Sequence, residues 1–285
     1  MSDKERNVLE EWRGSAPYWE KHGKTIRIMF APITRALIEA AGIRKGQSVL
    51  DVAGGTGEPS ITIAEVVGQS GRVVCTDAVA EMVAAAEREA DLLKLGNIEF
   101  RQCLADSLPF PDNEFDVVVS RLGAMFFPAP DDALGEMLRV AKPGGRVALA
   151  VWGVKEANPF FSAVTEVMSR YLESPPEDPC APGAFRFSER GKLTRLLETA
   201  GAIEIDEQAV NFQIQAKLTP REFWPLRVEI SDSLRTKVSS LPPAQLSLVA
   251  EEVAEAVREH FHDGRMNMPA QVIVVRAKKA HLTHL

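Results

Sequence analysis

A glycine-rich turn near residue 53 constrains the fold of this chain more than any other feature. Residues 49–52 form a short apolar, β-branched run, and the small residues at 53–57 let backbone approach a ligand closely. Pro59 then stands where a helix can begin, because the first helical position needs no N–H. Strand, turn and helix in this order predict the opening of a Rossmann-like βαβ unit.

The residues around this turn indicate which kind of cofactor it serves. Asp77 ends the next apolar run about 20 residues beyond the glycines, where a carboxylate can accept both hydroxyls of a ribose. The dinucleotide spacing fails, because Ala53 and Gly55 are followed by Glu58 instead of a third glycine. A carboxylate at the amino end of a helix would repel a pyrophosphate. A cofactor that carries a sulfonium and an ammonium group meets no such repulsion.

This turn resembles the first motif of the class I S-adenosylmethionine (SAM) methyltransferases. Their pattern, acid-x-G-x-G-x-G, is matched by Asp51, Ala53, Gly55 and Gly57, with alanine in place of the first glycine. The sequence Ala-Gly-Gly-Thr-Gly is similar to the variant in the ubiquinone/menaquinone methyltransferase family. The alanine costs little if φ stays negative at this position.

Four further segments extend the resemblance over roughly residues 45–153. Asp77 with Met82 is similar to the D-x4-M element of the family, and residues 104–116 resemble its D-A-E-x-L-P-F-P-D-x-x-F-D segment. Residues 121–127 and 138–145 resemble its loop after the fourth strand and its L-x-P-G-G turn. Several ordered motifs are far more specific than one glycine pattern.

The resemblance implies a set of cofactor contacts. We expect the methionine end beside Gly55, Thr56 and Gly57, the ammonium group near Asp51, the ribose on Asp77, and adenine between Met82 and Leu104. Leu104 replaces the adenine-binding Asp of the family, so the contact to the adenine amino group shifts to Asp106 or to backbone near Ala105. The other expected cofactor residues are Tyr18, Ala53, Gly54, Ala78 and Arg121.

Helix and strand patterns alternate along the chain after two predicted helices near residues 5–22 and 25–41, which predicts a parallel sheet. With the resemblance, the fold class is α/β: a Rossmann-like, doubly wound, seven-stranded sheet with an antiparallel last strand, a helical N-terminal extension and helical cap insertions. The predicted strands are 48–52, 72–76, 97–101, 115–120, 145–151, 202–208 and 271–277. The predicted later helices are 58–68, 79–95, 131–141, 189–200, 219–238 and 242–260.

The same patterns suggest a division of the chain. It comprises N-terminal helices over the cofactor site (1–44), a SAM-binding core (45–153), a lid insertion (154–187), a core continuation (188–215), a helical cap insertion (216–268) and a final strand with a tail (269–285). We expect both insertions to lie over the carboxyl ends of the strands, where open α/β sheets bind ligands.

An apolar stripe at helical spacing marks the lid insertion, with Phe160, Phe161, Val164, Val167, Met168 and Tyr171 on one face. The functional interpretation is a mobile lid over an acceptor pocket. The expected pocket residues are Phe126, Trp152, Phe160, Phe161 and Met168. The alternative is a helix that buries an ordinary core face.

Candidate catalytic groups are few. His22 is the candidate general base for an acceptor that must lose a proton, and a surface histidine at a helix end is the alternative. The expected function is methyl transfer from SAM to a small, apolar or aromatic acceptor. A SAM-binding sensor or partner subunit without catalysis, and an NAD-dependent oxidoreductase, are the alternatives.

The composition of the chain limits the kinds of molecule that it is expected to bind. The net charge of −7 over 285 residues argues against a nucleic-acid groove, since phosphate binding needs clustered cations. The three cysteines are too scattered for a disulfide framework or a metal site. No segment approaches the ~20 apolar residues of a membrane span. We expect a cytoplasmic protein that acts on a small molecule and binds neither nucleic acid nor metal; a homodimer is compatible with these features.

Overall fold

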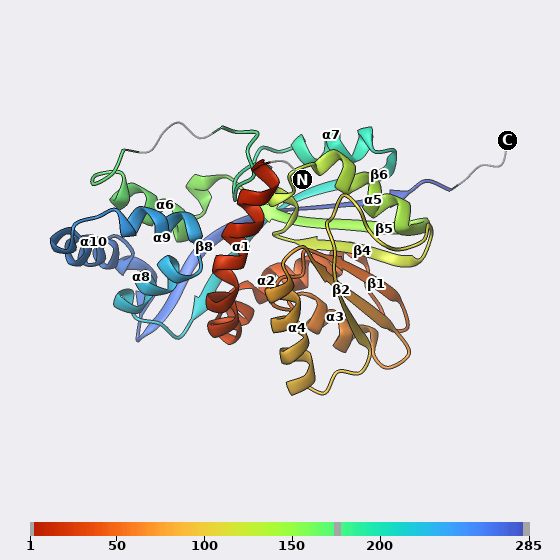
Figure 1. Cartoon of the computed structure of the whole chain (residues 1–285), viewed down its shortest axis with the longest axis horizontal. Coiled ribbons are helices and arrows are strands. Elements are labelled where there is room, and N and C mark those ends of the chain that lie inside the picture. Colours follow the sequence, from red (N-terminus) through yellow and green to blue (C-terminus); the bar gives the residue numbers. More distant parts are fainter. Residues whose placement is uncertain (1–2, 174–177, 282–285) are drawn as a thin grey trace.

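The computed structural model describes residues 3–173 and 178–281. Residues 1 and 2, part of the predicted lid insertion (174–177) and the end of the predicted tail (282–285) lie outside the described residues. An eight-stranded sheet with helices on both faces forms the centre of the molecule (Figure 1). The expected α/β, Rossmann-like fold class is confirmed.

The sheet has the order β3-β2-β1-β4-β5-β8-β6, and the short β7 pairs only with β8. The five strands of its first half run parallel. They are β1 (Ser48–Val52), β2 (Arg72–Asp77), β3 (Ile98–Gln102), β4 (Phe115–Arg121) and β5 (Ala141–Trp152). β8 (Arg265–Lys279) runs antiparallel to both β5 and β6, as expected for the last long strand.

The order of strands reverses at β1, which pairs with β2 on one side and with β4 on the other. Val49 lies opposite Val73 in one neighbour and opposite Val117 in the other, and all three side chains are fully or almost fully buried. The connections on the two sides of β1 therefore run in opposite directions. A crevice opens between them at the carboxyl ends of β1 and β4.

Helices cover the two faces in separate groups (Figure 1). α2 (Gly23–Ala41), α3 (Ser60–Val67) and α4 (Ala80–Leu92) lie below the sheet in that view, and α5 (Pro130–Val140) and α7 (Lys192–Thr199) lie above it. α2 buries one apolar face that includes Met29, Ile33 and Leu37. It packs across β4, β5, β6 and β8, so it belongs to the core of the fold.

The remaining helices form a cap at the left end of the molecule (Figure 1). The cap consists of α6 (Pro159–Met168), α8 (Pro220–Glu229), α9 (Asp232–Ser239) and α10 (Pro243–Ala256). Short 3-10 helices, η1 (Ala124–Phe126), η2 (Lys155–Ala157) and η3 (Arg258–His260), and the strand β7 (Phe261–His262) complete the connections.

Three predictions for this end of the chain were wrong in their bounds. β6 (Ala202–Ala216) and β8 are longer than predicted, because both strands continue beyond the parallel sheet into the cap. The helix predicted at 219–238 is two helices, since Ile230 ends α8 and the hydroxyl of Ser231 caps α9 by accepting from the backbone N–H of Leu234.

α1 (Asp3–Lys21) stands between the core and the cap (Figure 1). Toward the core, Arg88 of α4 forms a bidentate ion pair with Glu20, with N–O distances of 2.8 and 2.9 Å. Toward the cap, the indole N–H of Trp19 donates to the carbonyl of Ile230 over 3.0 Å. α1 is therefore tied to both halves of the molecule.

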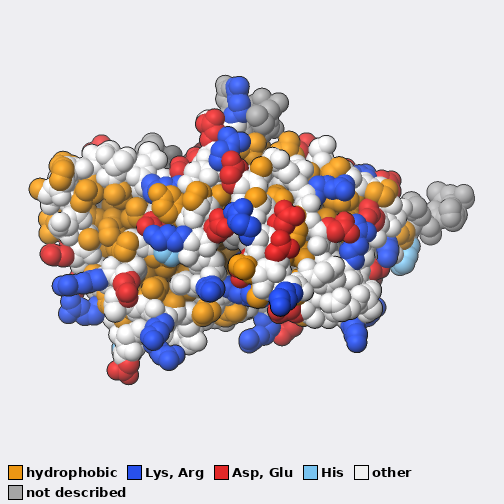
Figure 2. All heavy atoms as spheres, turned by 60° about the horizontal axis from the view of Figure 1, so that its bottom comes forward, with side chains coloured by type: hydrophobic (Ala, Val, Ile, Leu, Met, Phe, Trp, Pro, Cys, Tyr) orange, Lys and Arg blue, Asp and Glu red, His pale blue; other side chains and the backbone are white. Residues whose placement is uncertain are grey.

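The surface facing the viewer in Figure 2 mixes cationic and anionic side chains without a dense cluster of one sign. Within residues 3–173 and 178–281, no helix combines the length and the apolar character needed to cross a bilayer.

Candidate functional site

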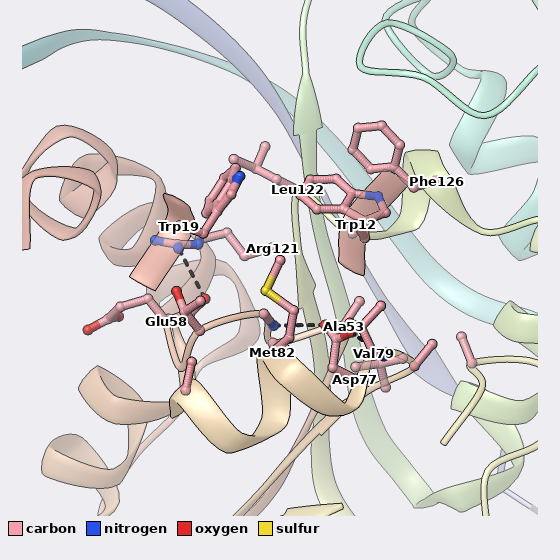
Figure 3. Close-up of a pocket in the computed structure, with 18 of the residues that line it drawn as sticks. Trp12, Trp19, Ala53, Glu58, Asp77, Val79, Met82, Arg121, Leu122 and Phe126 are labelled. Carbon is pink, nitrogen blue, oxygen red and sulfur yellow. Dashed lines mark hydrogen bonds between the residues drawn. The ribbon is translucent and has the colours of Figure 1, made fainter. Parts of the chain in front are cut away.

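A cavity of about 280 Å³ opens at the carboxyl ends of β1, β2 and β4. The glycine turn forms its floor, residues 77–79 and 103–106 form one wall, and residues 121–123 form another. α1, α2 and α4 contribute residues to the rest of the lining. Figure 3 shows how these side chains converge. The cavity thus lies at the point where the strand order reverses.

The glycine turn needs its small residues for different reasons. A side chain at Gly55, where φ is +56°, would meet nothing within 4 Å and would enter the cavity region, because Gly55 lines the cavity. A Cβ at Gly54 would lie 2.6 Å from Cys75 Sγ, and one at Gly57 would lie 2.8 Å from Ile61. Gly57 therefore serves helix packing and, contrary to expectation, does not line the cavity.

Ala53 does not meet the condition under which an alanine costs little in the turn. Its φ is +60°, in the left-handed region. Leu122, at the end of β4, also has a positive φ of 61°. A Cβ at Gly123 would lie only 2.6 Å from that of Ala53, so the two loops meet closely at the cavity. Left-handed conformations of residues other than glycine cost free energy and cluster at ligand sites.

Asp77 connects the turn to the next helix. Its carboxylate accepts from the backbone N–H of Gly55 over 3.0 Å and from that of Val79 over 2.9 Å. Burial raises the pKa of Asp77 to about 6, against the opposing effect of these hydrogen bonds. The carboxylate lines the cavity and has lone pairs for further donors.

Asp51 lies beneath the turn and does not line the cavity. Its carboxylate accepts from the hydroxyl of Ser60 over 2.6 Å, and its other oxygen has no hydrogen-bond partner among the described residues. Burial raises the pKa of Asp51 to about 7, opposed by Ser60 and by the charge of Arg121. This position differs from the expected one beside an ammonium group, because the side chain points under the loop.

Arg121 ends β4 and lines the cavity. The guanidinium donates to Thr34 Oγ1 over 2.7 Å and to the carbonyl of Glu58 over 3.0 Å. Burial lowers its pKa, while the charges of Glu58 and Asp51 act in the opposite direction. A buried cation thus lies at this end of the cavity.

Apolar side chains also line the cavity. They include Val79 and Met82 from the start of α4, and Leu104, which has 38% of its surface exposed. The remaining expected cofactor residues Thr56, Ala78, Ala105 and Asp106 also line the cavity. A flat apolar group fits between such side chains.

Two aromatic residues of the lining were missed from the sequence. Trp12 and Trp19 of α1 both face the cavity, with ring centroids 5.7 Å apart. Leu9, Trp12, Ala16 and Trp19 recur at helical spacing, and this apolar stripe was the signal that could have identified them.

The expected residues Tyr18 and His22 point elsewhere. The ring of Tyr18 lies under the guanidinium of Arg235, 4.8 Å from its carbon, and His22 pairs with Glu229 of α8. Neither side chain lines the cavity. Tyr18 on α1 and His22, which immediately precedes α2, both contact helices of the cap, so the structure does not bring the candidate base to the site.

Residues 43–201 match the family described as methyltransferase domain, and they make up more than half of the chain. The chain belongs to this methyltransferase family. The matched segment runs from just before β1 to just beyond α7 and contains the glycine turn, Asp77 and Arg121. α1 and the helices α8 to α10 lie outside it.

The chain is similar to a curated relative, the ubiquinone/menaquinone biosynthesis C-methyltransferase UbiE of Ectopseudomonas mendocina. It is 42% identical over 136 residues, which cover 47% of this chain and 53% of the relative. The chain spans about half the length of the curated relatives it matches.

Solved structures show the same fold. Phosphoethanolamine N-methyltransferase 2 of Haemonchus contortus, in complex with S-adenosyl-L-methionine, has a TM-score of 0.55 at 18% identity and covers 92% of this chain and 57% of its own. The [4+2]-cyclase SpnF has a TM-score of 0.54 at 22% identity and covers 88% of this chain and 80% of its own. At such identities the likeness shows the fold alone.

In this methyltransferase, only one of the expected acceptor-pocket residues lines the cavity, namely Phe126. Trp152, Phe160 and Met168 are at least 96% buried in the core, and Phe161 packs against Trp152 with ring centroids 5.1 Å apart. These side chains do not reach the cavity, so the structure differs here from the expected acceptor pocket.

The apolar stripe on α6 packs against α8, a neighbouring helix of the cap. The ring of Phe160 lies 5.6 Å from that of Phe223 in α8, and the guanidinium of Arg227 lies 4.3 Å from Phe160 and 4.8 Å from Phe161. Four residues of the stripe, Phe160, Val164, Val167 and Met168, are thus buried against their neighbours, as the alternative to a lid expects, while the mobile lid stays a prediction. Helical spacing indicates a buried face but does not say what covers it.

Proposed function

We propose that this chain transfers a methyl group from SAM to a small, apolar or aromatic acceptor bound in the same cavity. The observation that carries the proposal is that two groups of residues line the same cavity. One group is the wall around Gly55 and Asp77, which carries the cofactor motifs. The other is the aromatic side chains of α1, Trp12 and Trp19, which we call the roof of the site. The proposed cofactor wall also includes Thr56, Ala78, Met82, Leu104, Ala105, Asp106 and Arg121.

The aromatic part of the lining supports an apolar acceptor. Trp12 packs edge to face against Phe126 with ring centroids 5.0 Å apart, and Leu122 lines the cavity nearby (Figure 3). Such side chains favour a planar or apolar partner over a highly charged one.

The chemistry makes modest demands on the protein. Methyl transfer from a sulfonium is an in-line displacement, so donor and acceptor atoms must be held near ~3 to 3.5 Å with water excluded. No histidine appears among the described lining residues. The geometry therefore supports a protein that holds donor and acceptor in position beneath α1, and it does not support proton transfer by His22.

Replacing Trp12 by alanine tests the acceptor end. We expect turnover at subsaturating acceptor to fall about 10- to 100-fold, because a buried aromatic side chain contributes roughly 1.5 to 3 kcal/mol of apolar contact. SAM affinity should change less than threefold. The measurement pairs calorimetric titration with methyl turnover on an acceptor identified from a metabolite library.

Trp12→Phe is the matched control and should retain most of the turnover, since it keeps an aromatic ring against Phe126. A loss of SAM affinity as large as the loss of turnover would place Trp12 over the cofactor and contradict the acceptor assignment.

The raised pKa of Asp77 predicts how SAM binding depends on pH. An ionised carboxylate accepts from the ribose hydroxyls, and its pKa of about 6 lies above the ordinary value of 3.8. Affinity should therefore be constant above pH 7 and fall as pH drops through 6, by up to about tenfold per unit. SAM dissociation constants between pH 5 and 8 give the profile.

Asp77→Asn is the control for this profile, because an amide does not titrate. The variant should bind more weakly at pH 8 and lose the drop near pH 6. A wild-type profile that stays flat down to pH 5 would contradict a direct contact between Asp77 and the cofactor.

A further inference from the structure

A turn between α6 and α7, residues 183–187, supports the part of the cavity that we assign to the acceptor. None of its residues lines the cavity. The turn is hydrogen-bonded to the short helix η1, and Phe126 and Phe127 at the end of η1 do line the cavity, together with Pro128 and Ala129. The turn is therefore placed to act on the cavity through η1.

Two hydrogen bonds join the turn to η1. The backbone N–H of Gly183 donates to the carbonyl of Met125 over 3.1 Å. The guanidinium of Arg186 donates to the carbonyl of Phe127 over 2.6 Å. The second bond is charge-assisted, and such bonds are about twice as strong as those between neutral groups.

The sequence explains why η1 needs partners from a distant segment. A 3-10 helix pairs each carbonyl with the N–H of the residue three positions later. For the carbonyls of Met125 and Phe127 these residues are Pro128 and Pro130, which have no N–H to donate. The turn at residues 183–187 supplies the two donors that the local chain lacks.

Aromatic side chains on both sides of Arg186 anchor the turn. Phe187 is 2% exposed, and its ring centre lies 5.4 Å from the guanidinium carbon of Arg186. Phe185 packs edge to face against Phe161 of α6, with ring centroids 5.2 Å apart. Burial lowers the pKa of Arg186, but a guanidinium in a protein stays charged. Arg186 therefore holds its carbonyl as a cation from a fixed position.

Phe126 carries the position of η1 into the cavity. Its ring meets that of Trp12 edge to face, with centroids 5.0 Å apart, and the two rings lie side by side in Figure 3. A shift of η1 would separate the rings and change the surface offered to an acceptor. Gly55 and Asp77, which we assign to the cofactor, belong to other loops and are hydrogen-bonded to each other.

We propose that Arg186 is a positioning residue for the methyl acceptor. It holds the carbonyl of Phe127 and thereby fixes η1, so that Phe126 keeps its place against Trp12. This inference rests on the proposed function, because it takes the cavity beside Phe126 as the place of the acceptor. It gives the segment between α6 and α7 a role in acceptor binding without any contact with the acceptor.

The contact between Trp12 and Phe126 can be followed without an acceptor. In protein labelled with 5-fluorotryptophan, the fluorine resonance of Trp12 is assigned from its loss in Trp12→Phe. We expect Arg186→Ala to move this resonance, and to have no further effect in a Phe126→Ala background. Arg186→Lys keeps a cationic donor on a long stem and should stay near the wild-type position.

Ligand affinities separate the acceptor from the cofactor. The probes are S-adenosylhomocysteine alone, and 1-naphthol, a planar uncharged aromatic, in the presence of saturating S-adenosylhomocysteine. Arg186→Ala should weaken 1-naphthol binding by about tenfold and change S-adenosylhomocysteine binding by less than about twofold. In a Phe126→Ala background it should cause no further loss, because residues that act through one group are not additive.

Arg190→Ala is the matched control. Arg190 follows the same turn, but its side chain is 69% exposed and its Nε lies 3.5 Å from Glu207 Oε1. It does not line the cavity. This variant should keep the wild-type resonance of Trp12 and both wild-type affinities. Thermal unfolding checks that every variant remains folded.

An unchanged Trp12 resonance in Arg186→Ala would overturn the inference, as would equal losses of 1-naphthol and S-adenosylhomocysteine. Additive losses in the double variant would overturn it too, since Arg186 would then act independently of Phe126. These results leave the proposed function intact. A wild-type protein that binds S-adenosylhomocysteine but not 1-naphthol would instead contradict the apolar acceptor of the proposed function, and the inference with it.

Discussion

Asp77→Ala should weaken SAM binding by about 1.5 to 3 kcal/mol, roughly 10- to 100-fold. The substitution leaves two ribose hydroxyls without a charged acceptor. It also releases the backbone N–H groups of Gly55 and Val79, which the carboxylate now holds. The measurement is a calorimetric titration of both proteins with SAM at pH 8, where the wild-type carboxylate is ionised.

Asp77→Asn separates the two effects, since its amide oxygen can still accept one hydrogen bond at the turn. We expect it to lie between Asp77→Ala and the wild type in affinity. SAM affinity within twofold of the wild type in Asp77→Ala would mean that the cofactor does not rest on β2.

Gly55→Val should abolish detectable SAM binding while the protein still unfolds cooperatively. Gly55 has a φ of +56°, and its missing Cβ faces open space at the cavity. A branched side chain there would occupy the volume that we assign to the cofactor and would strain the turn. Titration with SAM, paired with thermal unfolding, measures both effects.

The control for backbone strain is Gly201→Val. Gly201 has a φ of +86° in the turn between α7 and β6, and a Cβ at this position would meet nothing within 4 Å. This variant should lose stability to a similar extent and bind SAM normally. Normal SAM binding by Gly55→Val would show that the turn is only a tight connection.

Local patterns predicted the core of the fold well, because each signal there is set by nearby residues. The apolar run at 49–52, the small residues of the turn and Asp77 lie within one βαβ unit, and the structure has that unit as predicted. The turn residue Ala53 was the exception. Its φ is positive and it lies close to Gly123 of the loop after β4, and no local pattern reveals either feature.

The roof of the site was harder to predict, because it depends on contacts between distant segments. Trp12 and Trp19 reach the cavity only because α1 is held between α4 and the cap, by pairs such as Glu20 with Arg88. The same packing turns Tyr18 and His22 toward α9 and α8. Spacing along a helix identifies its apolar face, but the partner of that face is fixed by the whole fold.

Titration of the wild-type protein with SAM and, separately, with NAD at pH 8 tests the central claim most directly. The glycine turn, Glu58 and Asp77 predict saturable binding of SAM with one site per chain, and no binding of NAD, whose pyrophosphate would meet the Glu58 carboxylate. Binding of NAD without binding of SAM would contradict the account.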